Sequence, residues 1–383
     1  MSEPIATNGV VHWAGTGLST GSGLEVLAGA ARSVTLYGRT ADKAARRLGE
    51  LSLAGRAGGA TMAELPDAVA SGDVVVSMLP ASEHGRLLRL CLDRGAHFAC
   101  TSYTSDEMAA ADEPARKLGL VVLTEAGLDP GIDHVLAHDL VDRARAAVGD
   151  GPATVTFRSY CGGLPAVPND FRYRFSWAPR GVLSALCSPA RSFEDGEVRD
   201  VDRPWEATTT YPLDGEPFEV YPNRDSLPFV AQYNLPAGWR PHTFVRGTLR
   251  LAGWSQAWAD VFAVLRGGDP GAVDALAAEL VAQHPMRPGD ADRVVLAVEL
   301  GVQTDEAGWH GRYLLDLTGD ERESAMARTV SLPLAYAVGG VLDGTTPAGL
   351  HRALPDPADT TAFLAYLRGR GIDCVLTEGT RKH

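Results

Sequence analysis

The stretch "VVHWAGTGLSTGSGLEVLAGA", residues 10–30, decides the fold. It joins an apolar run typical of a buried strand to a glycine-rich turn and then to a helical pattern. In a dinucleotide-binding turn the first glycine permits the tight turn, and the second lets the backbone approach a pyrophosphate. Gly15 and Gly17 stand at these two positions, whereas Thr20 replaces the usual third glycine. The stretch therefore predicts a strand, turn and helix that together hold a dinucleotide.

Short apolar runs alternate with helical patterns along the first third of the chain. The runs read "VVHWAG", "VTLYGRT", "GGATM", "DVVVSMLP", "HFACTSY" and "GLVVLTE", and helical segments such as "SEHGRLLRLCLDRG" separate them. Near-continuous apolar strands separated by helices predict a parallel sheet that is covered on both faces. We therefore expect residues 1–133 to form a dinucleotide-binding α/β domain of Rossmann type, with a doubly wound parallel sheet.

The sequence changes character after "GLDPGIDH". A long stretch rich in Trp, Tyr, Pro and Arg precedes "RVVLAVELGVQ" and "GRYLLDLTG", which are typical of paired antiparallel strands. We expect residues 134–322 to form an inserted α+β substrate domain with a mixed or antiparallel sheet. Residues 323–383, which begin with the helical "ESAMARTVSLPLAYAVGGVLDG", are expected to pack back on the nucleotide domain.

Composition argues against several classes of partner. The formal net charge of −13 disfavours nucleic acid or an anionic membrane, because both bind clustered Lys and Arg. The start "MSEPIATNG" lacks the features of a secretory signal, and no apolar run approaches the roughly 20 residues that span a bilayer. The chain has only five cysteines, and they form no C-x-x-C motif. This cysteine usage is typical of a protein from a reducing compartment. We expect a cytoplasmic protein without a disulfide framework.

The end of the second predicted strand indicates the cofactor. It reads "LYGRT" and lacks the acid that would bind the ribose hydroxyls of NAD. Arg39 can instead pair with a 2′-phosphate, so we expect NADP(H) in preference to NAD(H); the alternative is that Arg39 is a solvated residue at a helix start. The expected cofactor-binding residues are Gly15, Gly17, Leu18, Ser19, Thr20, Arg39, Thr40, Leu79, Pro80 and His84.

Several motifs, taken in order, resemble a known family. "TSY", "GLDPGIDH", "SYCGGLPA", "FSWAPRGVL", "YPNRDS" and "VRGTLR" are similar to the saccharopine reductase group of the saccharopine dehydrogenase family, and "AMARTV" resembles its C-terminal segment. The resemblance implies NADP-dependent interconversion of saccharopine, or a related secondary-amine amino acid, with L-glutamate and 2-aminoadipate 6-semialdehyde through an imine. It also implies a homodimer, with the dimer contact in residues 134–322.

Reduction of an imine needs a group that controls the proton on nitrogen. Asp129, Tyr103 and Cys161 match family positions that line the site, and any of the three could exchange this proton. Asp129 is favoured for electrostatic support of the iminium, with a turn-capping aspartate as its structural alternative. For Cys161 the alternative is a small buried hydrophobe, which is common for a free cysteine.

A substrate with several carboxylates needs guanidinium partners, which bind carboxylates bidentately. Arg224 in "PNRDS" is the first candidate and Arg246 in "VRGTLR" the second. The expected substrate-binding residues are Ser102, Gly162, Phe175, Ser176, Asn223, Arg224, Arg246 and Thr248.

Three alternatives stay open or are set aside at this point. A lysine 6-dehydrogenase or a carboxynorspermidine synthase would use the same chemistry between amine and imine. A non-catalytic NADP-binding regulatory protein is disfavoured, because the candidate catalytic residues are all present.

No metal is expected: His134 and His138 have helical i,i+4 spacing, but no third ligand pattern accompanies them.

Overall fold

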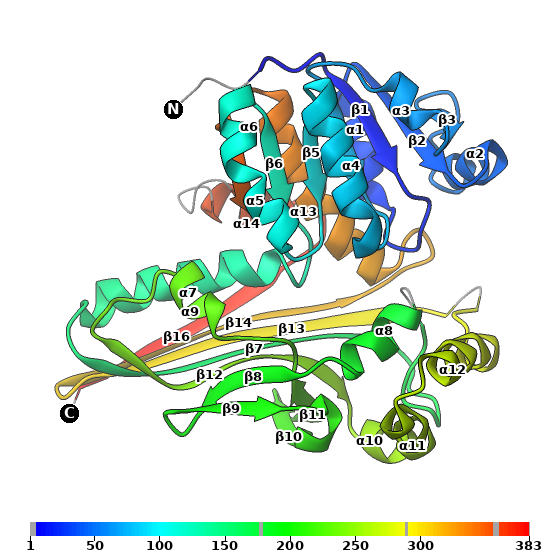
Figure 1. Cartoon of the computed structure of the whole chain (residues 1–383). Coiled ribbons are helices and arrows are strands. Elements are labelled where there is room, and N and C mark those ends of the chain that lie inside the picture. Colours follow the sequence, from blue (N-terminus) through cyan, green and yellow to red (C-terminus); the bar gives the residue numbers. More distant parts are fainter. Residues whose placement is uncertain (1–4, 176–178, 288–289, 355–359, 383) are drawn as a thin grey trace. The chain divides into compact units, whose positions relative to one another are not determined.

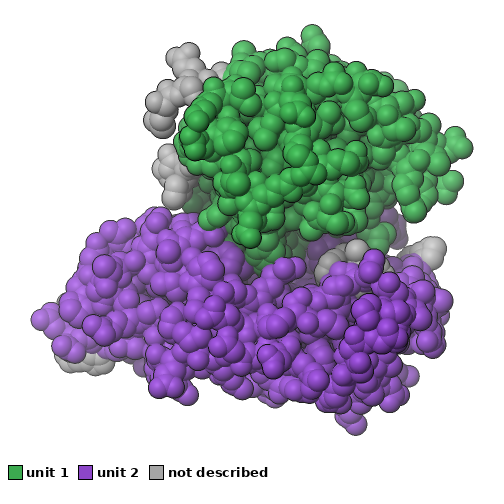
Figure 2. Space-filling view, viewed as in Figure 1, with its two compact units in different colours: residues 1–135, 327–370 green, residues 136–326, 371–383 purple. Residues whose placement is uncertain are grey.

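The chain folds into two compact units, shown in a computed structural model (Figures 1 and 2). All residues are described except 1–4, 176–178, 288–289, 355–359 and 383. Unit 1 comprises Met1–Val135 and Ala327–Arg370, and unit 2 comprises Leu136–Met326 and Gly371–His383.

Among the described residues of unit 1, seven strands form one sheet, and every adjacent pair in it is parallel. β1 lies between β4 and β2, so the strand order reverses on its two sides, which is the arrangement of a doubly wound nucleotide-binding sheet. The predicted Rossmann-type fold is therefore confirmed. In sheet order the strands are β15 (Gly349–Arg352), β6 (Val121–Thr124), β5 (His97–Cys100), β4 (Val74–Ser77), β1 (Val10–Ala14), β2 (Ser33–Gly38) and β3 (Gly58–Thr61).

Helices cover both faces of this sheet (Figure 1). On one face Leu24, Leu48 and Leu334 pack with the strands, and on the other Leu87 and Met108 do so. Alternate residues of each strand point to opposite faces, which is why the strands read as continuous apolar runs. The first face carries α1 (Ser22–Ala30), α2 (Ala41–Glu50) and α13 (Ala325–Leu342); the second carries α3 (Leu65–Ala68), α4 (Ala81–Arg94), α5 (Asp106–Ala110) and α6 (Asp112–Leu118).

α13 is a core helix of unit 1. Within the described part of the chain it is the one helix whose length and hydropathy of 1.3 match a membrane span, but 67% of that window is buried inside the protein. Its residues Ala335, Val338 and Val341 belong to the same apolar core as α1, and Tyr336 packs on Phe363 of α14 (Thr360–Arg368). Burial against the sheet accounts for its apolar composition.

α1 and α13 are in direct backbone contact at Gly23. The Gly23 N–H donates to Ser331 Oγ at 3.0 Å, and a Cβ on Gly23 would lie 2.0 Å from the Ser331 carbonyl oxygen. Gly23→Ala is therefore expected to push the two helices apart and to lower the free energy of unfolding by about 2 kcal/mol, as overpacking does.

Gly49→Ala is the matched control for this prediction, measured by the same urea unfolding experiment. A Cβ at Gly49 in α2 meets nothing within 4 Å, so this change is expected to stabilise the protein by about 0.5–1 kcal/mol through backbone entropy. A Gly23→Ala variant as stable as the Gly49→Ala variant would contradict the proposed contact.

In unit 2 the described strands form a mixed sheet, as predicted. β7 and β12 are parallel neighbours, whereas the other paired strands run antiparallel. The path of the sheet is β10 (Thr209–Leu213), β11 (Glu216–Pro222), β12 (Trp239–Leu251), β7 (Ala153–Pro165), β13 (Asp292–Gln303), β14 (Ala307–Thr318) and β16 (Cys374–Lys382), with β8 (Ala190–Glu194) and β9 (Glu197–Val201) branching from β12.

Helical segments complete unit 2. An aromatic core that includes Trp205, Trp254 and Trp258 fills the space between several of them and the sheet. The segments are the larger part of α7 (Ile132–Val148), then α8 (Pro179–Leu186), the 3-10 helix η1 (Pro204–Ala207), α9 (Pro228–Gln232), α10 (Trp254–Ala257), α11 (Ala259–Gly267) and α12 (Pro270–Gln283).

The C-terminal segment divides between the units, in contrast to the expectation that all of 323–383 packs on the nucleotide domain. Most of α13, β15 and α14 belong to unit 1, but β16 pairs antiparallel with β14 of unit 2. This pairing satisfies the backbone donors and acceptors of β14, which would otherwise be an exposed edge. Helix patterning in the tail does not reveal such a long-range strand pairing.

Candidate active site

Thr20 closes the glycine-rich turn after β1. Its hydroxyl donates to the Gly15 carbonyl at 3.0 Å and accepts from Trp13 Nε1 at 3.3 Å. Gly15 has φ of +123°, and a Cβ there would lie 2.9 Å from the Met78 carbonyl, so this position requires glycine. A Cβ at Gly17 would meet nothing within 4 Å. Thr20 therefore replaces the third glycine with a side chain that fastens the turn.

The turn leads into a helix N-terminus suited to an anion. α1 begins after Gly21, which carries no side chain that could cap the first amides. Such amides and the helix dipole together attract phosphate. Gly17 and Leu18 beside them are exposed. The local structure therefore fits the pyrophosphate of a dinucleotide.

Basic side chains surround the end of β2. Arg39 is exposed directly after the strand, and Thr40 caps α2 by accepting from the Lys43 amide at 3.2 Å. Lys43 is exposed as well, one helical turn from Arg39. Two exposed cations make this position suitable for a phosphate group.

His84 is buried and engaged on both ring nitrogens. Nδ1 lies 2.9 Å from Ser77 Oγ and Nε2 lies 2.8 Å from Ser102 Oγ. Burial lowers the pKa of His84 to about 4, so the ring is neutral at pH 7. Its contacts link the carboxyl ends of β4 and β5. Leu79 and Pro80, in contrast, lie at the accessible start of α4, half-buried and exposed respectively.

Tyr103 and Asp129 meet at the carboxyl ends of β5 and β6. These strands are parallel neighbours, so the loops that follow them lie side by side. The Tyr103 hydroxyl donates a hydrogen bond to Asp129 Oδ1 at 2.6 Å, and both residues are half-buried. A phenol that donates to a carboxylate over this distance forms a strong, charge-assisted bond.

A closed turn presents Asp129. The Gly127 N–H donates to the Pro130 carbonyl at 2.9 Å, and the Gly131 N–H donates to Asp133 Oδ1 at 2.7 Å. Gly131 has φ of +148°, and a Cβ there would lie 2.0 Å from the Gly127 carbonyl, so no larger residue fits. The turn is thus held by its own backbone, which fixes the position of the Asp129 carboxylate.

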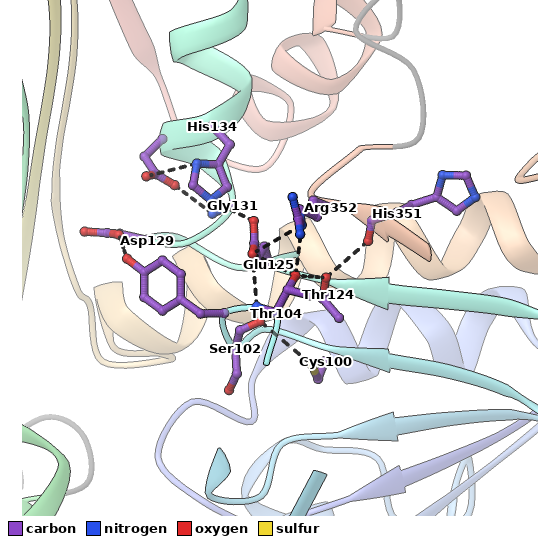
Figure 3. A network of polar contacts seen from close by, with 12 residues as sticks. Cys100, Ser102, Thr104, Thr124, Glu125, Asp129, Gly131, His134, His351 and Arg352 are labelled. Atoms are coloured by element: carbon purple, nitrogen blue, oxygen red, sulfur yellow. Dashed lines mark hydrogen bonds and ion pairs between the residues drawn. The ribbon is translucent and has the colours of Figure 1, made fainter. Parts of the chain in front are cut away.

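A buried carboxylate lies behind this pair and is absent from the predicted set. Glu125 directly follows β6 and is 3% exposed. Its Oε1 accepts from the Thr104 N–H at 3.0 Å and from the Thr104 hydroxyl at 2.8 Å, while Oε2 lies 3.1 Å from His134 Nε2 (Figure 3). The sequence signal for Glu125 is an acid placed directly after an apolar strand of the nucleotide-binding sheet.

In unit 2 the sheet brings Cys161 and Thr248 together. Residues paired across strands lie on one face of a sheet. Cys161 of β7 pairs with Thr248 of β12, and Thr248 pairs in turn with Tyr221 of β11. Cys161 is 9% exposed and Thr248 is half-buried. Two residues that the sequence predicts for the site therefore share one row of this face.

Gly162 lies on the opposite face from Cys161, because alternate strand residues point in opposite directions. A Cβ there would lie 2.2 Å from the Leu249 carbonyl of β12. The close backbone approach that this glycine permits is made by the neighbouring strand. This packing reason differs from the substrate binding that the sequence predicts for Gly162.

The candidate arginines have different surroundings. Arg246 is 3% exposed, and its guanidinium carbon lies 4.0 Å above the Phe229 ring. Arg224 is exposed, with φ of +60°, and its carbonyl accepts from the Arg191 N–H at 2.9 Å. The Asn223 N–H donates to the Arg246 carbonyl at 2.9 Å. Arg224 is thus at the surface of unit 2, whereas Arg246 is packed inside it.

The aromatic stretch contributes mainly to the core. Phe175 is 4% exposed and packs edge-on against Tyr173, with ring centroids 5.1 Å apart. Ser176 lies outside the described residues. Arg250, which the predicted set omits, is 5% exposed and donates to the Tyr221 hydroxyl at 3.0 Å. Its position two residues after Thr248 on the same strand face is the available sequence signal.

The two histidines of α7 have separate partners. His134 contacts Glu125 and Asp133, and His138 packs edge-on against Tyr233 at 5.5 Å. Within the ranges that the structure describes, no group of three or more metal-ligating side chains is suited to a metal ion.

All five cysteines are free thiols, of which only Cys187 is exposed. Burial raises the pKa of Cys91 and raises that of Cys100 to about 12, so both are protonated at pH 7. These two thiols are inert packing residues.

Comparison with known proteins agrees with this geometry. A family model described as the saccharopine dehydrogenase NADP binding domain matches residues 12–123, and one for the saccharopine dehydrogenase C-terminal domain matches residues 127–372. Fold and site thus define an NADP-binding domain joined to a domain of dehydrogenase type. The chain belongs to the saccharopine dehydrogenase family, and the resemblance seen in its motifs is confirmed.

Two relatives illustrate the range of similarity. A saccharopine dehydrogenase [NADP(+), L-glutamate-forming] of Pyricularia oryzae is 40% identical over 200 residues, which cover 51% of this chain and 43% of that protein. The mitochondrial alpha-aminoadipic semialdehyde synthase of Bos taurus is 29% identical over 360 residues, which cover 74% of this chain and 38% of that protein. The chain therefore matches less than half the length of each of these relatives.

Solved structures match along nearly the whole chain. The apo saccharopine dehydrogenase (L-Glu forming) of Saccharomyces cerevisiae has a TM-score of 0.79 and 25% identity, covering 97% of this chain and 99% of that one. A homospermidine synthase of Legionella pneumophila, solved with NAD, has a TM-score of 0.62 at 10% identity and shares the fold.

Proposed function

We propose that this protein is an NADP-dependent oxidoreductase that interconverts saccharopine with L-glutamate and 2-aminoadipate 6-semialdehyde. The observation that carries the proposal is the 2.6 Å contact of Tyr103 with Asp129 at the carboxyl edge of a nucleotide-binding sheet, in a member of this family. Substrates of doubly wound sheets bind at that edge. Fungal relatives named for this activity support the assignment.

The cofactor would be held by unit 1. Gly15, Gly17 and the first amides of α1 would receive the pyrophosphate, and Arg39 would pair with the 2′-phosphate. When bound, the nicotinamide cofactor supplies or accepts the hydride. Leu18, Ser19, Thr40, Leu79 and Pro80 complete the proposed set, and His84 contributes by holding Ser102.

Oxidation of saccharopine removes a hydride from carbon and a proton from nitrogen. Water then adds to the imine carbon, and cleavage of the carbon–nitrogen bond releases the amino acid and the semialdehyde. Asp129 would stabilise the positively charged iminium, and the Tyr103 hydroxyl would donate and recover a proton at this edge. In unit 2, Cys161 shares one sheet face with Thr248, and we propose both as site residues.

The substrate carboxylates need cationic partners. Arg224 is the first candidate because its side chain is at the surface of unit 2, with Asn223 next to it. Arg246, the second candidate, would contribute from within the fold, where its guanidinium packs on the Phe229 ring. The other residues proposed to bind substrate are Ser102 of unit 1 and Gly162, Phe175 and Thr248 of unit 2.

A direct assay tests the proposed function. Purified protein is incubated with L-saccharopine, and reduction of NADP and of NAD is followed in parallel, with lysine as the alternative substrate. We expect rapid NADP reduction with saccharopine. Reduction with lysine alone would identify a lysine 6-dehydrogenase, and tight NADPH binding without turnover of either amine would favour a regulatory protein.

Arg39→Glu tests the cofactor assignment. The substituted carboxylate repels a 2′-phosphate, so the Kd for NADPH is expected to rise about ten- to a hundredfold while the Kd for NADH changes little. Titration of nicotinamide fluorescence measures both constants. Arg32→Glu is the matched control, because Arg32 is exposed but lies at the amino end of β2. Equal losses in both variants would argue against Arg39.

The proposal extends to assembly and location. We propose a cytoplasmic homodimer with its contact in unit 2, on the basis of the family resemblance. The formal net charge of −13 disfavours nucleic acid or an anionic membrane as a partner. Size-exclusion chromatography with light scattering measures the mass in solution. A monomeric mass at micromolar concentration would contradict the dimer.

A further inference from the structure

Two separate loops carry the central pair of the proposed site. Tyr103 belongs to the loop that follows β5, and Asp129 belongs to the turn that follows β6. Their hydrogen bond forms only if both loops keep their positions. A buried side chain lies between the two loops and contacts both.

That side chain is Glu125. One oxygen, Oε1, accepts both donors of Thr104, the residue next to Tyr103, at 3.0 and 2.8 Å. The other, Oε2, lies 3.1 Å from Nε2 of His134, in the first turn of α7. His134 Nδ1 lies 3.4 Å from Asp133, the carboxylate that accepts from the Gly131 N–H. The two oxygens of one carboxylate therefore reach the loop of Tyr103 and the first turn of α7, which directly follows the Asp129 turn (Figure 3).

The backbone at Glu125 is unusual for its residue type. Its φ of +56° lies in the left-handed region, which is unfavourable for a residue with a Cβ. Its N–H donates to the Ser102 carbonyl at 3.0 Å, which ties it a second time to the loop of Tyr103. Such conformations persist where surrounding contacts determine them, and they gather at functional sites.

The charge of Glu125 is also balanced within unit 1. Arg352 Nε lies 3.8 Å from Oε1 and donates to the Thr104 hydroxyl at 3.2 Å. The Thr104 hydroxyl in turn lies 2.7 Å from that of Thr124, the last residue of β6. A carboxylate that is 3% exposed is thus contacted by Thr104, Arg352 and His134, which suits a fixed structural element.

We propose that Glu125 is a positioning residue that holds Tyr103 and Asp129 in contact by joining their two loops. The proposal rests on the proposed function for its catalytic consequence, but the joining itself is a property of unit 1. His134 is the partner through which Glu125 acts on the Asp129 turn.

Glu125→Gln tests the joining without any assay of activity. Glutamine keeps the shape but replaces one acceptor oxygen with an NH2 donor and removes the charge, so the carboxylate contacts with Thr104 and His134 cannot both be kept as they are. Amide hydrogen exchange is measured by mass spectrometry in wild type and variant. We expect faster exchange in peptides covering 101–108 and 126–135, and unchanged exchange in a peptide covering 33–50. Unchanged exchange in both of the first two peptides would overturn the joining.

Steady-state kinetics test the consequence for catalysis. Glu125→Gln is expected to lower kcat roughly ten- to a hundredfold through misplacement of the reacting groups, with the KM for NADP unchanged. His134→Gln, which can still donate to Glu125, should retain several times the kcat of His134→Leu, which cannot. Glu113→Gln, at an exposed position of α6, is the matched control and is expected to behave as wild type.

The outcomes separate this proposal from the proposed function. Wild type that is inactive with saccharopine refutes the function, while the exchange experiment still decides whether Glu125 joins the loops. Faster exchange in both loops with an unchanged kcat would overturn the positioning role. Equal activity of the two His134 variants would show that His134 is not the partner through which Glu125 acts.

Discussion

Asp129→Asn is expected to lower kcat for saccharopine oxidation about a hundred- to a thousandfold, the usual loss when a group that stabilises developing charge is removed. Asparagine has the same shape, and its Oδ1 can still accept from the Tyr103 hydroxyl, so the turn from Gly127 to Gly131 should keep its structure. The amide lacks the negative charge that stabilises an iminium and cannot take up a proton at neutral pH. Steady-state kinetics with saccharopine and NADP measure the loss.

Controls separate this loss from damage to the fold. The NADPH affinity of the Asp129→Asn variant, measured by fluorescence titration, should equal that of wild type. Asp106→Asn, on the exposed first turn of α5, should leave kcat unchanged. Tyr103→Phe removes only the hydroxyl and is expected to lower kcat about a hundredfold, the lower end of losses for a group that transfers protons. Full turnover by Asp129→Asn would remove Asp129 from the mechanism.

The free energy of unfolding is expected to fall by about 3 kcal/mol between pH 6.5 and pH 4 because of His84 alone, since one pKa unit corresponds to about 1.4 kcal/mol. Burial lowers the pKa of His84 from 6.5 to about 4 in the folded protein. Between these values the unfolded chain binds a proton that the folded protein does not. Stability is therefore complete above pH 6.5 and is lost as the pH falls toward 4.

Urea unfolding at pH 7 and pH 5 measures this effect. Between pH 7 and pH 5 the free energy of unfolding of wild type should fall by about 2 kcal/mol more than that of His84→Gln, because glutamine does not titrate. The comparison isolates His84, since burial also lowers the pKa of His97 and His351 and both remain in the variant. His242→Gln, at a half-exposed position, should follow wild type. Identical pH dependence of wild type and His84→Gln would contradict a neutral, buried His84.

Sequence patterns predicted the parallel sheet of unit 1 well. The runs "VVHWA" and "VVVS" are buried strands, and the glycine-rich turn lies between β1 and α1. These predictions held because each depends on residues that are close together in the chain. The mixed sheet of unit 2 was predicted as a class but not in its pairing, since β7 joins β12 and β13 across long intervals of sequence.

Single site residues were harder to interpret. His84 follows a strand end in the sequence, but its ring is buried between Ser77 and Ser102. Gly162 stands next to Cys161, but strand alternation turns it to the opposite face. Residue type and order show which chemistry is present. They do not show which way each side chain points.

The sequence by itself determined the class of fold and the preference for NADP, because strand and helix periodicity, the glycine-rich turn and Arg39 are local features. The family followed from the resemblance of its ordered motifs. Only the tertiary structure decided that Tyr103 reaches Asp129, 26 positions away, and that Glu125 contacts the loops of both. Such contacts depend on β5 and β6 becoming neighbours in the sheet. Strand pairing is a long-range outcome of packing, so residue order alone does not specify it.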